Sequence, residues 1–158
     1  MPTGDCWFTL FDTAIILTME HLRYFGFLYA AMFFFVAFMG YIPQFLDGDG
    51  YLFGLFALDI YDNLLHAFSG IWILLASFTS LRHTILYFTV FGTIYFLDGM
   101  IGLVVGNAFL DFSLFKYGIA DNSLLIKFLL NVPHIIIGGT AMIIGFYLSK
   151  KPYFNRSR

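Results

Sequence analysis

The 8 basic and 10 acidic residues of this 158-residue chain leave long stretches without any charge. Three stretches of 23, 19 and 22 residues, at 24–46, 63–81 and 128–149, contain no Asp, Glu, Lys or Arg. A fourth stretch, 83–110, is interrupted by Asp98 alone. A helix needs about 20 apolar residues to cross a hydrocarbon core about 30 Å thick. The charge distribution therefore predicts four transmembrane helices.

The composition excludes most other classes of protein. Hydrophobic residues make up 60% of the chain and charged residues only 11%. A soluble domain is about 25% charged, so this chain could not cover a surface that faces water. The net charge of −2 also gives no basic surface for nucleic acid. We expect the lipid bilayer as its partner, and no nucleic acid.

The expected architecture is all-α: a polytopic membrane protein with a four-helix transmembrane domain at residues 22–149. We place its spans at 22–42, 62–81, 84–109 and 124–148. Residues 1–21 form an N-terminal segment that either lies at the membrane interface or precedes a translation start at Met19. Residues 150–158 form a basic cytoplasmic tail.

The basic residues predict the orientation of the chain. With four spans, both termini and the second loop share one side of the membrane. That side carries six of the eight basic residues: Arg23, Arg82, Lys150, Lys151, Arg156 and Arg158. Because basic residues favour the cytoplasmic side, we expect both termini in the cytoplasm, and a bacterial cytoplasmic membrane as the location.

Two short motifs occur twice, in the same order. The pattern N-x-x-H-x-x-x-G occurs in the second and fourth spans, 68 residues apart, as Asn63–Gly70 and Asn131–Gly138. The pattern G-x-x-Y with a later glycine occurs in the first and third spans, 66 residues apart, as Gly26-x-x-Tyr29 with Gly40 and Gly92-x-x-Tyr95 with Gly106. The chain is therefore predicted to be a tandem repeat of a helical hairpin. Each hairpin has an even number of spans, so we expect the copies to share one orientation in the membrane.

These motifs carry a resemblance to a known family. The segment Leu55-Phe-Ala-Leu-Asp59 leads into the first N-x-x-H pattern, and the second pattern follows the Gly92–Tyr95 helix. Over about residues 20–150 the chain resembles the uncharacterised four-helix membrane proteins catalogued as domain of unknown function 4383. The resemblance implies the four-helix fold and importance for the two N-x-x-H patterns. It implies no activity, because the family has none to transfer.

Five polar residues lie inside the predicted spans and form the candidate intramembrane cluster: Asn63, His66, Asp98, Asn131 and His134. Asn and His three residues apart share one face of a helix. From the predicted depths we expect the histidines and Asp98 in one layer of the outer half of the membrane, with the asparagines one turn above. The simplest interpretation is hydrogen bonding between helices, which contributes about 0.6–2 kcal/mol per bond in membranes.

Small residues recur on one face of several spans. Glycine allows two helices to approach closely, and small-xxx-small patterns are typical of helix contacts in membranes. The candidate packing glycines are Gly70, Gly99, Gly102, Gly106, Gly138 and Gly139.

The sequence carries no sign of an enzyme. It contains no glycine-rich phosphate loop, no nucleophile elbow and no carboxylate pair at catalytic spacing. We therefore predict a non-enzymatic protein, an accessory or structural subunit of a larger membrane complex with other membrane subunits as partners. Short loops and glycine faces suit such contacts.

Two alternative functions also fit these residues. His66 and His134 on diagonal helices could hold haem b or a chlorophyll-type pigment across the bundle. A small ion or proton pathway using Asp98 is the second alternative, because a carboxylate inside a membrane is costly and is often functional. A metal site of the two histidines and Asp98 is chemically allowed, but no metal-binding motif supports it, so no metal ligand is predicted.

Overall fold

A computed structural model describes residues 5–149, with side chains from residue 21 onward. Regular secondary structure in this part of the chain is helical, apart from isolated bridges around Leu52. The helices are α1 (Asp5–Met39), the short 3-10 helix η1 (Pro43–Phe45), α2 (Ile60–Thr79), α3 (Leu81–Val105), α4 (Ser113–Tyr117) and α5 (Leu124–Ser149). The predicted all-α class is confirmed. Helix α1 runs without a break across the boundary expected near residue 21.

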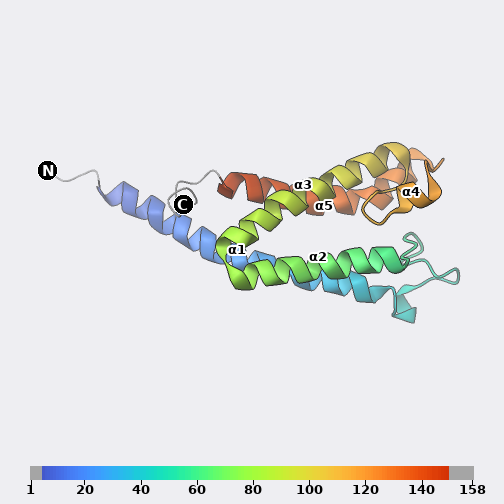
Figure 1. Ribbon diagram of the computed structural model, residues 1–158, viewed down its shortest axis with the longest axis horizontal. Coiled ribbons are helices and arrows are strands. Elements are labelled where there is room, and N and C mark those ends of the chain that lie inside the picture. The colour runs from blue at the N-terminus through green and yellow to red at the C-terminus, as the bar shows by residue number, and fades with distance from the viewer. Residues whose placement is uncertain (1–4, 150–158) are drawn as a thin grey trace.

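The long helices form two antiparallel hairpins, α1 with α2 and α3 with α5 (Figure 1). Most contacts between helices lie within the hairpins, above all between α3 and α5, and few join one hairpin to the other. The hairpins meet near the turn from α2 to α3 and diverge toward the opposite end, where α4 and the connecting loops lie (Figure 1).

Within the described residues, three helical segments are long and apolar enough to cross a membrane, not the four expected: His21–Met39, Leu81–Val105 and Leu124–Ser149. Helix α2, expected as a span at 62–81, is not among them. The first two turns of α2 carry Asp62, Asn63 and His66, and these polar residues lower its mean hydropathy. Its 20 residues still give it a length of about 30 Å.

Local capping fixes where α2 and α3 begin and end. Asp59 Oδ1 accepts hydrogen bonds from the backbone N–H groups of Tyr61 (2.7 Å) and Asp62 (3.2 Å), and Asp62 Oδ2 accepts one from Asp59 N–H (3.0 Å). This reciprocal capping box satisfies N–H groups that a helix start leaves without partners. Ser80 separates α2 from α3 in an extended conformation, and its hydroxyl caps α3.

Arg23 joins the two helices of the first hairpin. Its guanidinium donates from Nε to Ser77 O (2.7 Å) and from Nη2 to Phe78 O (3.1 Å). The last carbonyls of a helix have no intrahelical partner and carry partial negative charge. Arg23 therefore stabilises the end of α2 and places the start of the apolar part of α1 beside it.

Aromatic rings on α3 form a continuous stack in the core. Tyr87, Phe91 and Tyr95 are four residues apart, and the centroids of successive rings lie 4.7 and 4.9 Å apart. All three are buried, and Phe33 of α1 packs edge-on against Phe91 and Tyr95. We call these three rings of α3 the aromatic stack. The stack runs along α3 and ends at Tyr95, which packs on His134.

Glycines let α3 and α5 touch backbone to backbone. A Cβ added at Gly138 would overlap the backbone nitrogen of Phe96, and one added at Gly99 would lie 2.8 Å from the Cβ of His134. Of the six candidate packing glycines, Gly99 and Gly138 approach the backbone of the other helix, whereas Gly70, Gly102 and Gly139 face side chains of a neighbouring helix. Gly106 differs, because it ends α3 with a left-handed φ of 92°, a conformation that favours glycine.

We expect Gly138→Ala to lower the free energy of unfolding by about 1–3 kcal/mol, because the added methyl group would force two backbones apart. The matched control is Gly139→Ala, where the methyl group would meet only the Phe96 ring, at 3.3 Å. Thermal unfolding of both variants in the same detergent checks this. Equal melting temperatures for the two variants would contradict the close α3–α5 contact.

Candidate functional site

Asp98 of α3 is fully buried and uses both carboxylate oxygens. Oδ1 accepts hydrogen bonds from the backbone N–H groups of Phe109 (2.7 Å) and Leu110 (2.9 Å). Oδ2 lies 2.7 Å from Nδ1 of His134 on α5. One side chain thus connects α3, α5 and the loop that follows α3. The cost of burying a carboxylate is offset when such donors surround it.

His134 is oriented by two neighbours. A carboxylate can only accept hydrogen bonds, so Nδ1 of His134 carries the proton that bonds to Asp98. The ring stacks on Tyr95 with centroids 4.4 Å apart. Nε2 remains as the second polar atom of the ring, and the side chain lines a cavity. A histidine held by a carboxylate in this way has a fixed tautomer.

His66 of α2 reaches the same region but does not contact Asp98 directly. Its Nδ1 lies 2.7 Å from the carbonyl oxygen of Asp62, so Nδ1 is the protonated nitrogen. Its Nε2 lies 3.4 Å from the hydroxyl of Tyr95, which donates to it. Tyr95 therefore lies between the two histidines, stacked on one and bonded to the other.

The two asparagines occupy separate helix contacts. Asn131 packs against Gly102, and its side-chain amide donates to Lys127 O (2.9 Å). Asn63 lies beside Gly40, and its buried Oδ1 has no hydrogen-bond partner within the protein. The structure thus brings His66, His134 and Asp98 together around Tyr95 and leaves the asparagines at the margins.

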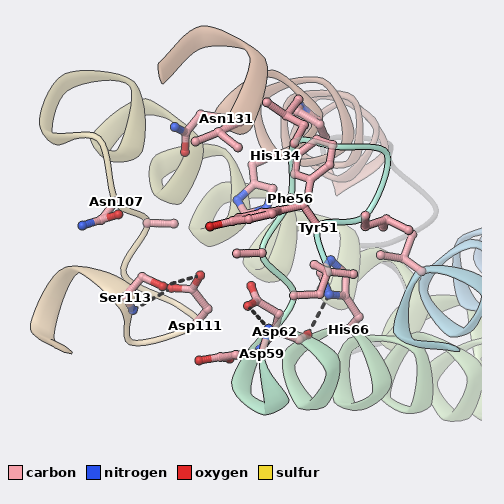
Figure 2. Close-up of a pocket in the computed structure, with 18 of the residues that line it drawn as sticks. Tyr51, Phe56, Asp59, Asp62, His66, Asn107, Asp111, Ser113, Asn131 and His134 are labelled. Carbon is pink, nitrogen blue, oxygen red and sulfur yellow. Dashed lines mark hydrogen bonds between the residues drawn. The ribbon is translucent and has the colours of Figure 1, made fainter. Parts of the chain in front are cut away.

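A cavity of about 650 Å³ lies where the hairpins diverge, and it adjoins this cluster. Its apolar wall comes from both hairpins and includes Met32, Phe33, Val36, Met39, Ile126, Leu130 and Ile137. Its polar lining includes Tyr51, Asp59, Asp62, His66, Asn107, Asp111, Ser113, Asn131 and His134 (Figure 2). A concave, mostly apolar site with a few convergent polar groups is typical of small-molecule binding.

Three carboxylates converge at the polar side of the cavity. Asp62 of α2 and Asp111, which precedes α4, lie close enough to interact directly (Figure 2). Asp111 also accepts from the backbone N–H (2.8 Å) and the hydroxyl (3.0 Å) of Ser113. Asp59 lies 3.4 Å from Lys116 Nζ. Burial raises the pKa of Asp59, but the two capping N–H groups and Lys116 outweigh burial and hold its pKa below the usual range.

The described part of the chain contains no group of three or more His, Cys, Asp or Glu side chains placed to hold a metal ion. Asp98 instead has His134 and two amides as partners, and His66 bonds to Asp62 O and Tyr95. The polar groups are therefore arranged around hydrogen bonds and an open cavity.

The helices, the buried polar cluster and the cavity define a small all-helical protein of membrane type. The family model described as Domain of unknown function (DUF4383) matches residues 23–138. This match covers well over half of the chain, so the chain belongs to that family, as the sequence motifs predicted. Comparison with curated proteins and with solved structures finds no match.

Sequence reasoning singled out the histidines and Asp98 but missed Tyr95, Asp62 and Asp111 as members of the site. The sequence does contain a signal for Tyr95, since this residue lies three positions before Asp98 and belongs to the repeated G-x-x-Y pattern. Asp62 and Asp111 directly flank the uncharged stretches, where the sequence predicts helix ends and loops. No spacing in the sequence brings them together, because they belong to different hairpins.

Removing the Asp98 carboxylate should release the loop after α3. We expect Asp98→Ala to cost about 3 kcal/mol or more of stability, since it leaves His134 and two buried amides without their partner. Hydrogen exchange at Phe109 and Leu110 should accelerate in this variant. Asp98→Asn, which keeps an oxygen for those amides, should show the smaller change. Unaltered exchange at both amides in Asp98→Ala would refute the role assigned to this carboxylate.

Proposed function

We propose that this chain is a non-enzymatic integral membrane protein that binds a membrane-soluble small molecule in the cavity between its hairpins. The observation that carries the proposal is the cavity itself, with an apolar wall and a polar side. Apolar side chains such as Phe35, Phe38 and Leu75 cover the outside of the helices, which suits contact with lipid. A ligand dissolved in the bilayer could then enter where the hairpins diverge.

In this proposal α2 also crosses the membrane and completes four spans. It packs antiparallel along α1 (Figure 1), and its length is close to the thickness of the hydrocarbon core. Four of its polar residues are buried within the protein: Asn63, His66, Ser69 and Ser77. A helix whose polar side chains are buried in protein is tolerated in lipid despite a modest mean hydropathy.

Reciprocal contacts support the proposed duplication of the hairpin. Tyr29 of α1 donates to Ile137 O of α5 (3.2 Å), and the matching Tyr95 of α3 contacts His66 of α2. Each tyrosine therefore reaches from the first helix of its own hairpin to the second helix of the other. Such an exchange is expected of two related units around a pseudo-two-fold axis.

The orientation with both termini in the cytoplasm remains part of the proposal and rests on the positive-inside rule. Arg23 supports it, because it lies beside the end of α2 and α3 begins two residues later with Arg82 in its first turn. The bacterial cytoplasmic membrane stays a prediction.

The geometry gives less support to the other three hypotheses: a tetrapyrrole site, a proton pathway and an accessory subunit. A tetrapyrrole held by both histidines would require Tyr95 to leave its place between them. A proton pathway through Asp98 would require a carboxylate with three hydrogen-bond partners to exchange them. The accessory-subunit role remains a prediction; the glycine faces that favoured it mostly lie in contacts within the chain.

Side-specific labelling tests the four spans. In a Cys6→Ser background, Gly48→Cys lies in the loop between α1 and α2, and Thr79→Cys is the last residue of α2. If α2 crosses the membrane, a membrane-impermeant maleimide added to sealed vesicles should label only one of these two variants. Labelling of both variants from the same side would place α2 along one face of the membrane and contradict four spans.

Blocking the cavity tests the binding function. We expect native mass spectrometry of the wild type, released from lipid nanodiscs, to show a retained small molecule. Val36→Trp should lose it, because Val36 lines the cavity and the larger ring would fill it. Phe35→Trp is the matched control, since its side chain is exposed on the same helix outside the cavity lining. Equal retention in both variants, or none in the wild type, would contradict the proposal.

A further inference from the structure

The charges around the cavity indicate what kind of molecule it would hold. The carboxylates of Asp59, Asp62 and Asp111 line it, and none of its lining residues is Lys or Arg. Asp59 is compensated by Lys116 at the rim, and Asp98 already accepts hydrogen bonds from His134 and two backbone N–H groups. Asp62 and Asp111 face each other without a basic partner among the residues that line the cavity.

Two adjacent carboxylates next to an apolar cavity are unfavourable unless a proton or a cation lies with them. The neighbouring polar atoms do not supply a cation. His66 already donates its Nδ1 proton to Asp62 O, and its Nε2 accepts from Tyr95. The polar side of the cavity therefore carries uncompensated acidic groups and is suited to a cation.

Aromatic rings add a second feature that suits a cation. Tyr51, Phe53, Phe56, Tyr95 and Tyr117 also line the cavity, and Figure 2 shows Tyr51 and Phe56 at its centre. A cation is attracted to the face of an aromatic ring, and carboxylates together with rings recognise ammonium groups. An apolar wall continues from these rings along α1 and α5.

Lys116 provides an example of this recognition within the chain. Its ammonium lies 3.4 Å from Asp59 Oδ2, 4.7 Å from the ring centroid of Tyr117 and 5.6 Å from that of Tyr61. Asp59 and Tyr117 are both cavity residues. The ammonium of Lys116 thus binds a carboxylate and a tyrosine ring at the rim of the cavity. The interior of the cavity is lined by the same two kinds of group.

We propose that the cavity binds a lipophilic organic cation, with its positive group between Asp62 and Asp111 and its apolar body against the wall formed by α1 and α5. This inference rests on the proposed binding function and specifies its ligand class. The positive group would replace the proton or solvent cation that the two carboxylates otherwise need. A neutral or anionic molecule of the same shape would leave that requirement unmet.

Two probes of the same shape and opposite charge test the inference. Tetraphenylphosphonium and tetraphenylborate are measured by equilibrium dialysis against the full chain in a neutral detergent, with empty micelles subtracted. We expect saturable binding of one tetraphenylphosphonium per chain, and tetraphenylborate weaker by at least about tenfold. This comparison uses the wild type alone, so it does not depend on any variant folding.

Substitutions then locate the bound cation. Asp62→Asn and Asp111→Asn each keep a hydrogen-bond acceptor for the local backbone and remove one charge; each should weaken tetraphenylphosphonium binding by about tenfold or more. Asp49→Asn removes the same charge from an exposed turn of the loop between α1 and α2, outside the cavity lining, and should leave the affinity within about twofold.

The outcomes separate this inference from the function on which it rests. If both probes bind equally and Val36→Trp abolishes both, the preference for cations is wrong while the binding cavity stands. If tetraphenylphosphonium binds but neither Asn variant weakens it, the assignment to Asp62 and Asp111 is wrong. If neither probe binds and the wild type also carries no small molecule in nanodiscs, both proposals are overturned.

Discussion

The Asp98 carboxylate organises the second hairpin. A carboxylate inside an apolar helix is tolerated only if donors surround it. Here there are three donors: His134 on α5 and the backbone N–H groups of Phe109 and Leu110 in the loop after α3. These bonds fix where the chain leaves α3 and how α5 stands against it. They also orient the His134 ring, on which the aromatic stack of α3 ends.

The unequal packing of the helices creates the cavity. Glycines at 92, 138 and 145 bring the backbones of α3 and α5 into contact, so the second hairpin closes tightly. In the first hairpin, Arg23 of α1 bonds to the last turn of α2, at the end that lies next to the turn from α2 to α3. Between the hairpins the contacts are few and include those of Phe33 with Tyr95 and of Tyr95 with His66. Beyond these residues the hairpins diverge, and acidic side chains from both line the opening.

Much of the fold could be predicted from where the charges lie. Uncharged stretches located α2, α3 and α5 to within a few residues, since a helix in lipid excludes charge. Helix α1 begins at Asp5, well before the expected start at residue 22. Asp98 was recognised as a charge inside a span for the same reason. Its two amide partners could not be predicted, because they depend on how the loop folds back after Gly106 ends α3. Nor could the pairing of Asp62 with Asp111, which requires the relative placement of two hairpins.

The central claim is that the space between the hairpins is a binding site and not a packing defect. A high-resolution structure of the full chain in lipid nanodiscs tests this claim most directly. The account predicts an open cavity between α1–α2 and α3–α5, with non-protein density against Asp62 and Asp111. A structure in which the hairpins close, so that Met39 or Phe33 packs onto Leu130 and fills the cavity, would contradict it.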